Sequence, residues 1–196
     1  MTVTARSASI FGTRVLNATA RVADFRPADA LLTVRGATSG PAADLLRYAR
    51  DSGLREPLRF LATTTASGNA RLDLKLDIPL AAGREVGVGG TITLANNDLV
   101  LNENILPFSR ANGRIDFNRR SVTMTGFSAG FAGGQLTASA STRPDGTITV
   151  SGSGSATPAG ISRQVDIALV QRLLAGAQGT TRYSGGWGFG ALFKLN

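Results

Sequence analysis

The stretch ARLDLKLDIPL, from Ala70 to Leu80, decides the fold class of this chain. Leucine or isoleucine alternates with arginine, lysine or aspartate from Arg71 to Ile78. Successive side chains of a strand point to opposite faces, so the pattern predicts a β-strand with one aliphatic and one charged face. Such a strand is typical of an antiparallel sheet with one solvated side. Pro79 has no backbone N–H to donate, which predicts the end of the strand or an edge position.

The same alternation recurs on both sides of this stretch, in short runs separated by turn residues. Before it, the alternating residues 16–22 and 32–34 predict two or three strands. After it, the turn residues of a meander are Ala95-Asn96-Asn97-Asp98, Arg119-Arg120, Gly133-Gly134 and Pro144-Asp145-Gly146. We therefore expect a mainly β fold, a long twisted antiparallel sheet with one hydrophobic face.

The large side chains on that predicted hydrophobic face are the candidate functional residues. They are Leu72, Leu74, Leu76, Ile78, Leu80, Val86, Val88, Ile92, Leu94, Leu99, Leu101, Ile115, Phe117, Val122, Met124, Phe127, Phe131, Leu136, Ile148 and Val150.

Only two segments have a helical period. The first is PAADLLRYARDS, residues 41–52, in which proline occupies a favourable first-turn position. The second is SRQVDIALVQRLLAG, residues 162–176, with apolar residues four apart and a terminal glycine. Two short helices cannot cover a sheet of about ten strands, which would be roughly 50 Å wide. The sheet therefore either closes into a sandwich or barrel, or stays an open gutter filled by acyl chains.

The composition argues against catalysis. The chain has no histidine and no cysteine, so the commonest general base and the commonest metal ligands are missing. Residues 126–130, GFSAG, match a nucleophile-elbow pattern, but alternating strand sequence follows them instead of a helix. We expect a protein that is not an enzyme, with no catalytic residues, no metal site and no cofactor.

The net charge of +8 leaves two anionic partners open, nucleic acid and lipid phosphate. The arginines are spread mostly one at a time, as on a solvated polar face. Phe117, Phe127 and Phe131 are in register with the aliphatic residues, whereas a nucleic-acid platform would place aromatic rings on the basic face. We expect no nucleic acid as a partner, and a basic nucleic-acid module is the weaker alternative.

Residues 58–179 resemble the AsmA-like superfamily, and within it the YhdP-type proteins. The resemblance rests on a series of elements in order: IPL at 78–80, VGGTITLANNDL at 88–99, ILPFSRANGRIDF at 105–117 and GFSAGFAGGQLTAS at 126–139. A later helix completes the series. The resemblance divides the chain into leading strands with a short helix (1–57), a β-groove segment with a C-terminal helix (58–179) and an atypical tail rich in glycine and aromatic residues (180–196). The tail is a truncation scar, a tag or an edge-covering strand.

The resemblance implies a taco-like β-groove whose hydrophobic residues carry phospholipid between the inner and outer membranes of Gram-negative bacteria. Acyl chains would then be the partners of the candidate residues. Relatives are longer and begin with a membrane anchor, whereas no apolar run of 18 residues occurs here. The chain is therefore expected to be the periplasmic part of an inner-membrane-anchored protein. A closed β-sandwich that serves as an envelope scaffold is the alternative.

Overall fold

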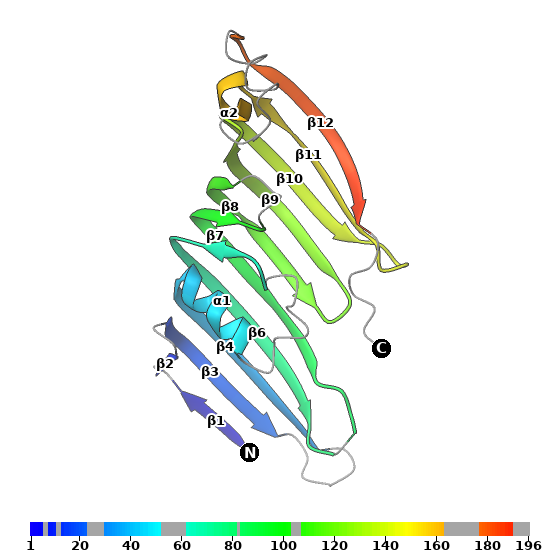
Figure 1. Ribbon diagram of the computed structural model, residues 1–196. Helices are drawn as coiled ribbons and strands as arrows, with labels where there is room; N and C mark the ends of the chain where they lie inside the picture. Colours follow the sequence, from blue (N-terminus) through cyan, green and yellow to red (C-terminus); the bar gives the residue numbers. More distant parts are fainter. Residues whose placement is uncertain are drawn as a thin grey trace.

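The computed structural model describes residues 1–5, 8–10, 13–22, 30–51, 62–81, 83–102, 107–162 and 177–189. They form one twelve-stranded antiparallel sheet with two helices, which confirms the mainly β fold (Figure 1). The strands are β1 (Thr2–Ala5), β2 (Ala8–Ile10), β3 (Thr13–Val22), β4 (Leu31–Pro41), β5 (Thr65–Ala66), β6 (Asn69–Pro79), β7 (Gly87–Val100), β8 (Phe108–Asn118), β9 (Val122–Phe131), β10 (Gly134–Thr142), β11 (Ile148–Ala156) and β12 (Thr181–Phe189). The helices are α1 (Ala42–Asp51) and α2 (Pro158–Ser162).

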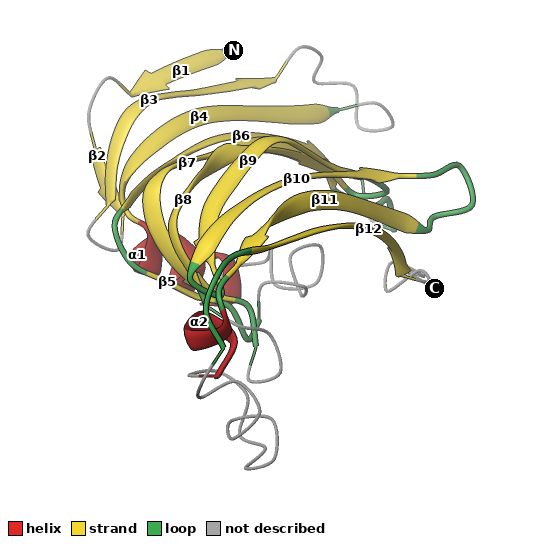
Figure 2. Cartoon of the chain, turned by 90° about the horizontal axis from the view of Figure 1, so that it is seen from above, coloured by secondary structure: helices red, strands yellow, loops and turns green. Residues whose placement is uncertain are grey.

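Ten of the strands follow one another across the sheet in the order β1-β3-β4-β6-β7-β8-β9-β10-β11-β12. The short strands β2 and β5 pair with β3 and β7. At about 4.8 Å per strand, the sheet is roughly 43 Å from β1 to β12. Figure 2 shows the strands arching in the same direction, with both helices on the concave side. The part of the chain described here is thus a single open layer, the twisted groove-like sheet that the sequence predicts, and not a closed sandwich.

Strand β6 carries the alternation that decides the fold. It pairs with β4 over its whole length and with β7 from Ala70 to Asp77. It ends at Pro79, as the missing N–H predicts. Leu80, predicted to be the last aliphatic residue of this strand, lies beyond its end and is 53% exposed.

The predicted turn at residues 95–98 is wrong, because β7 continues through it as one strand of 14 residues. The register between β7 and β8 shifts at this point, and Asn96 has a positive φ of 59°. These are the features of a β-bulge, in which one extra residue is inserted into a strand. The bulge keeps Leu94 and Leu99 on the same face although they are an odd number of positions, five, apart; both are buried.

Asn97 holds this bulge in place. Its side chain is completely buried, its Nδ2 donates a hydrogen bond to the Ser67 carbonyl (2.8 Å), and its Oδ1 accepts one from the Ala95 N–H (2.8 Å). The adjacent Gly68 carbonyl accepts a hydrogen bond from the N–H of Ala42, the first residue of α1. Asn97 therefore connects the bulge to the segment beside which α1 begins.

Three further irregularities act in the same way. Arg110 in β8 has a φ of 50°, Gly126 in β9 has a φ of 61°, and both lie where the register between neighbouring strands shifts. In β3 a shift between Val15 and Asn17 turns Leu16 outward, so Leu16 does not continue the predicted alternation and is 38% exposed. Each bulge bends its strand and increases its twist, which curves the sheet.

Helix α1 confirms the first predicted helix. It begins directly after Pro41, has Asp44 in its first turn and Arg50 in its last, and these charges complement the helix dipole. The second predicted helix, residues 162–176, lies almost wholly outside the described residues. The short helix α2 precedes it, and the Thr157 hydroxyl accepts a hydrogen bond from the Gly160 N–H as an N-cap (3.0 Å). No helix among the described residues has the length and apolar character to cross a membrane.

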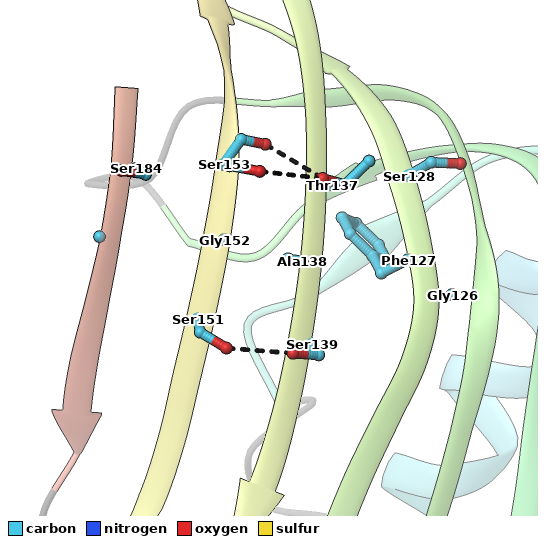
Figure 3. Close-up of a pocket in the computed structure, with 11 residues that line it drawn as sticks. Gly126, Phe127, Ser128, Thr137, Ala138, Ser139, Ser151, Gly152, Ser153 and Ser184 are labelled. Atoms are coloured by element: carbon cyan, nitrogen blue, oxygen red, sulfur yellow. Dashed lines mark hydrogen bonds between the residues drawn. The ribbon is translucent and has the colours of Figure 1, made fainter. Parts of the chain in front are cut away.

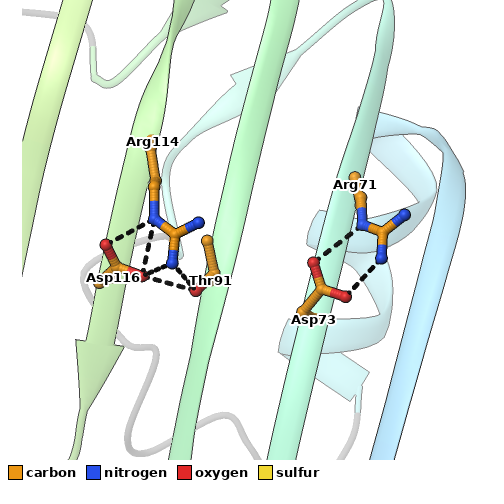
Figure 4. A network of polar contacts seen from close by, with 5 residues as sticks. All are labelled: Arg71, Asp73, Thr91, Arg114 and Asp116. Carbon is orange, nitrogen blue, oxygen red and sulfur yellow. Dashed lines mark hydrogen bonds and ion pairs between the residues drawn. The ribbon is translucent and has the colours of Figure 1, made fainter.

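The convex face, which we call the outer face, carries ion pairs between residues two apart on one strand (Figure 4). Arg71 and Asp73 pair at 2.8 Å, Lys75 and Asp77 at 2.6 Å, and Arg114 and Asp116 at 2.7 Å. The hydrogen bond from Arg71 lowers the pKa of Asp73, and the one from Lys75 lowers the pKa of Asp77. Hydrogen bonds from Arg114 and then Thr91 lower the pKa of Asp116.

We expect Asn97→Ala to destabilise the protein by about 1–3 kcal/mol, because the Ser67 carbonyl and the Ala95 N–H would lose a buried partner. The measurement is the midpoint of urea denaturation. Asn96→Gly is the matched control, since Asn96 is exposed and glycine readily adopts its positive φ. An equal effect of both changes would contradict the role given to the Asn97 side chain.

We also expect stability to depend on pH through the outer-face carboxylates. Their pKa is depressed in the folded chain, so their stabilising contribution is complete above the unfolded value of about 4 and is lost as pH falls through the folded value. The urea midpoint should therefore stay level from about pH 7 to 5 and fall below about pH 4. The double variant Asp73→Asn, Asp116→Asn should be less stable at neutral pH and show a smaller fall. A constant difference between the two proteins at every pH would contradict this account.

Candidate functional site

The concave face carries a continuous apolar row that crosses the sheet perpendicular to the strands. Strand pairing places Leu72 opposite Ile92, Ile92 opposite Ile115 and Ile115 opposite Met124. It then places Met124 opposite Ala140 and Ala140 opposite Val150. We call this set, Leu72, Ile92, Ile115, Met124, Ala140 and Val150, the apolar row. It contains no charged residue and passes through six neighbouring strands, β6 to β11.

Other apolar side chains extend this face on either side of the apolar row. Leu76 lies opposite Val88, and Phe117 lies opposite Val122. We call the concave apolar face as a whole the floor. Its strands arch, so the floor is the inner surface of a groove whose axis runs across the strands, along the apolar row (Figure 2).

The structure places the predicted residues in three classes of burial. Buried residues are Leu72, Val88, Leu94, Leu99, Phe117 and Phe127. Half-buried residues are Leu74, Leu76, Ile78, Ile92, Leu101, Ile115, Val122, Met124, Phe131, Leu136, Ile148 and Val150. The two exposed residues are Leu80 and Val86, which lie outside the strands and do not belong to the floor.

Helix α1 accounts for much of the deep burial. Leu45 of α1 packs against two clusters of buried residues, and Tyr48 packs against the cluster formed by Leu72, Val88 and Phe117. The helix lies beside β4, β5 and β6 and covers the floor around this cluster. On β9 to β11, Val122, Met124, Leu136, Ile148 and Val150 remain half-buried.

Several residues of this region were not predicted from the sequence. The Phe108 ring stacks on Phe131, with centroids 5.1 Å apart, and meets Phe127 edge to face at 5.8 Å. Ala111 is fully buried beside them, in a cluster that also contains Ala129. Phe108 was missed because the bulge at Arg110 changes the alternation of β8. The positive φ that identifies this bulge is not visible in the sequence.

Tyr183 was also not predicted from the sequence. It lies in β12 and extends the apolar surface beyond β11. It pairs with Gly154 of β11, and its ring lies so close that a Cβ added at Gly154 would approach the Tyr183 hydroxyl to 2.8 Å. That hydroxyl is buried and has no hydrogen-bond partner among the described residues. Burial raises the pKa of Tyr183. Because Gly154 has no side chain, the Tyr183 ring can pack over its backbone.

A shallow depression of about 610 Å³ lies on the outer face over β9 to β12 (Figure 3). The hydroxyls that line it come from Ser128, Thr137, Ser139, Ser151, Ser153 and Ser184. Thr137 Oγ1 donates to the Ser153 carbonyl (3.2 Å), and the hydroxyls of Ser139 and Ser151 are 3.1 Å apart. Most of these groups therefore bond to one another across strands, and none of the lining residues is charged.

The serine of the GFSAG pattern does not lie on a strand-to-helix turn. Ser128, the serine of the GFSAG pattern, lies in the middle of β9, and Phe127 beside it faces the floor. The pattern is thus ordinary strand sequence, as its alternation predicts. No group of three or more metal-binding side chains occurs within the described ranges.

The family comparison agrees with this geometry. The chain matches the family model described as YhdP protein over residues 1–188. No curated protein sequence and no solved structure matches it. The match includes β1 to β11 and all but the last residue of β12. An arched open sheet with one apolar and one polar face is what the resemblance implies, and the chain belongs to the YhdP protein family.

Proposed function

We propose that this chain is a segment of an envelope protein that holds phospholipid acyl chains on its floor and conducts them along the groove. The apolar row carries the proposal, because it offers a continuous path across six strands without a charged side chain. Membership of the YhdP family, an AsmA-like group, supports an envelope role. In this proposal the chain lies in the periplasm, the rest of the protein anchors it in the inner membrane, and lipid moves between the two membranes.

The need for an occupant follows from the burial of the floor. On β9 to β11 five of the large apolar side chains of the floor are only half-buried, although the strands that carry them are well paired: Val122, Met124, Leu136, Ile148 and Val150. Removing apolar surface from water contributes about 25 cal/mol per Å² to the binding free energy. An acyl chain that lies on this surface would therefore bind more tightly the more of its length is in contact. Contiguous apolar surface is typical of ligand-binding grooves, which supports the proposal.

The role is proposed as one of binding and guidance, without chemistry. The floor offers methyl, methylene and aromatic groups, and the hydroxyls on the outer face bond mainly to one another. An apolar surface cannot distinguish one acyl chain from another of similar length, because contacts with methylene groups are not directional. The groove is therefore expected to accept phospholipids with different acyl chains.

The first test is whether lipid accompanies the protein. We expect the intact protein, extracted gently from its membrane, to carry phospholipid, with native mass spectrometry showing the bound mass and lipid extraction giving its class. The physical reason is that contact between the half-buried floor and water is less favourable in free energy than contact with acyl chains. Well-folded protein that is free of lipid and takes up none from vesicles would contradict the proposed function and favour an interaction scaffold.

The second test places a charge on the floor. Met124→Asp would put a carboxylate in the middle of the apolar row, where contact with acyl chains removes it from water, and lipid transfer between vesicles should fall at least tenfold. Thr125→Asp is the matched control, because Thr125 is exposed and its strand partner is Arg114 on the outer face. We expect the control to transfer lipid as the unchanged protein does.

Denaturation of both variants separates binding from folding. The groove is open to water at Met124, so Met124→Asp should lower the urea midpoint only modestly. Unfolding of this variant would mean that Met124 belongs to a closed core. If the Met124→Asp protein is well folded and transfers lipid normally, the floor is not the transport path and the proposal is contradicted.

A further inference from the structure

The hairpin turns at one rim of the groove repeat at regular intervals. The links after β6, β8 and β10 lie at the same rim because antiparallel neighbours alternate in direction, and they comprise residues 80–86, 119–121 and 143–147. Consecutive hairpins are two strands apart, or about 10 Å. Helices α1 and α2 follow β4 and β11 at the opposite rim (Figure 2).

This hairpin rim is rich in arginine. Its described cations are Arg84, Arg119, Arg120 and Arg143, and its described acids are Glu85 and Asp145. Arg119 Nη1 contacts Glu85 Oε2 at 2.6 Å and also donates to the Val86 carbonyl at 3.3 Å, which joins two neighbouring hairpins. The rim is thus positive where the hairpins meet solvent.

Arg120 is an exposed cation of the hairpin rim in the part of the chain that the structure describes. The Arg120 guanidinium forms no hydrogen bond and no ion pair with the described residues. On the outer face, in contrast, Arg71 and Arg114 each pair with an aspartate. Aspartates on the same strands thus neutralise Arg71 and Arg114, whereas no described acid pairs with Arg120.

The turn that presents Arg120 is held by hydrogen bonds. Asn118 Oδ1 accepts from the N–H of Arg120 (2.8 Å) and of Ser121 (2.9 Å), and Asn118 Nδ2 donates to Ser121 Oγ (2.6 Å). The backbone position of Arg120 is therefore fixed by the turn, while its side chain is exposed.

The floor begins directly inside this turn. Phe117 and Val122 form the last strand pair before it, with Ile115 and Met124 of the apolar row as the next pair on the same face. The order from the rim inward is thus guanidinium, then apolar side chains. A phospholipid has the same order, phosphate followed by acyl chains.

We propose that Arg120 binds the phosphate of a phospholipid whose acyl chains lie on the floor, so that headgroups leave the groove at the hairpin rim. This inference rests on the proposed function and adds the headgroup chemistry to it. A guanidinium donates paired, charge-assisted hydrogen bonds to phosphate oxygens. Arg143 and Arg84, on the neighbouring hairpins, add positive potential along the path of the headgroups. The apolar row accommodates the chains, and Arg120 sets the side on which the headgroup lies.

The experiment compares two lipids and two variants in the intact protein. The lipids are phosphatidylglycerol and diacylglycerol with the same acyl chains, which differ in the phosphate-containing headgroup, each presented in otherwise identical vesicles. The variants are Arg120→Gln and Arg71→Gln, which remove the same charge from the rim and from the outer face. We expect Arg120→Gln to weaken phosphatidylglycerol binding about fivefold, the effect of one basic residue near a lipid phosphate, and to leave diacylglycerol binding unchanged. Arg71→Gln should change neither, and Arg120→Lys should restore most of the phosphatidylglycerol binding.

The outcomes separate this inference from the proposed function. If the unchanged protein binds neither lipid, both fail. If it binds both lipids and Arg120→Gln has no effect, the floor remains a lipid site and the phosphate contact is overturned. Equal losses for Arg71→Gln, or equal losses of diacylglycerol binding, would also overturn it, because they indicate general charge or misfolding. Inorganic phosphate should compete no better than chloride at equal ionic strength, and stronger competition would indicate a free-anion site instead.

Discussion

The fold depends on the register that keeps apolar side chains of neighbouring strands on the same face. Leu72, Ile92 and Ile115 meet in one row because β6, β7 and β8 keep a constant register around these three residues. A slip of one residue in any pair would turn the apolar side chains of that strand to the outer face and bring charged ones to the floor. The ion pairs on the outer face favour the same register, because Arg71, Asp73 and Asp116 would be costly on the apolar side.

Strict alternation alone would not maintain the floor along the longer strands. In β7, β8 and β9 an extra residue is inserted beside Asn96, at Arg110 and at Gly126, and each insertion restores the apolar side chains to the concave side. The same insertions bend the strands. One feature therefore provides both the curvature of the groove and the continuity of its apolar surface, and the buried Asn97 side chain stabilises it in β7.

A single open layer leaves the apolar face of its sheet in contact with water, whereas a sandwich buries that face against a second sheet. Two packed sheets bury each other, whereas here α1 covers one part of the floor, around Leu72, Val88 and Phe117. The remaining floor, around Met124 and Val150, is stabilised by strand pairing but stays half-buried. In the proposed function the lipid completes the hydrophobic core, so that binding and stability are linked through the same surface.

The sequence by itself determined the fold class, the first helix and most of the floor. The alternation from Leu72 to Ile78 is a local property of strands, and it predicts which side chains share a face without any knowledge of the neighbours. The composition, with no histidine or cysteine, predicts a binding surface and no catalytic centre. The terminal position of Pro79 in β6 follows equally directly, since a missing N–H cannot be replaced.

Only the tertiary structure decided where strands continue and which side chains the bulges bring inside. Residues 95–98 have the composition of a turn, yet pairing with β6 and β8 and the burial of Asn97 keep them within β7. Phe108 and Tyr183 join the floor through a bulge and through the space left by Gly154, and neither feature has a local sequence pattern. Whether the sheet closes or stays open was also beyond the sequence, because period-2 alternation is the same in a sandwich and in a groove. The curvature comes from bulges and pairing between strands, which are properties of the assembled sheet.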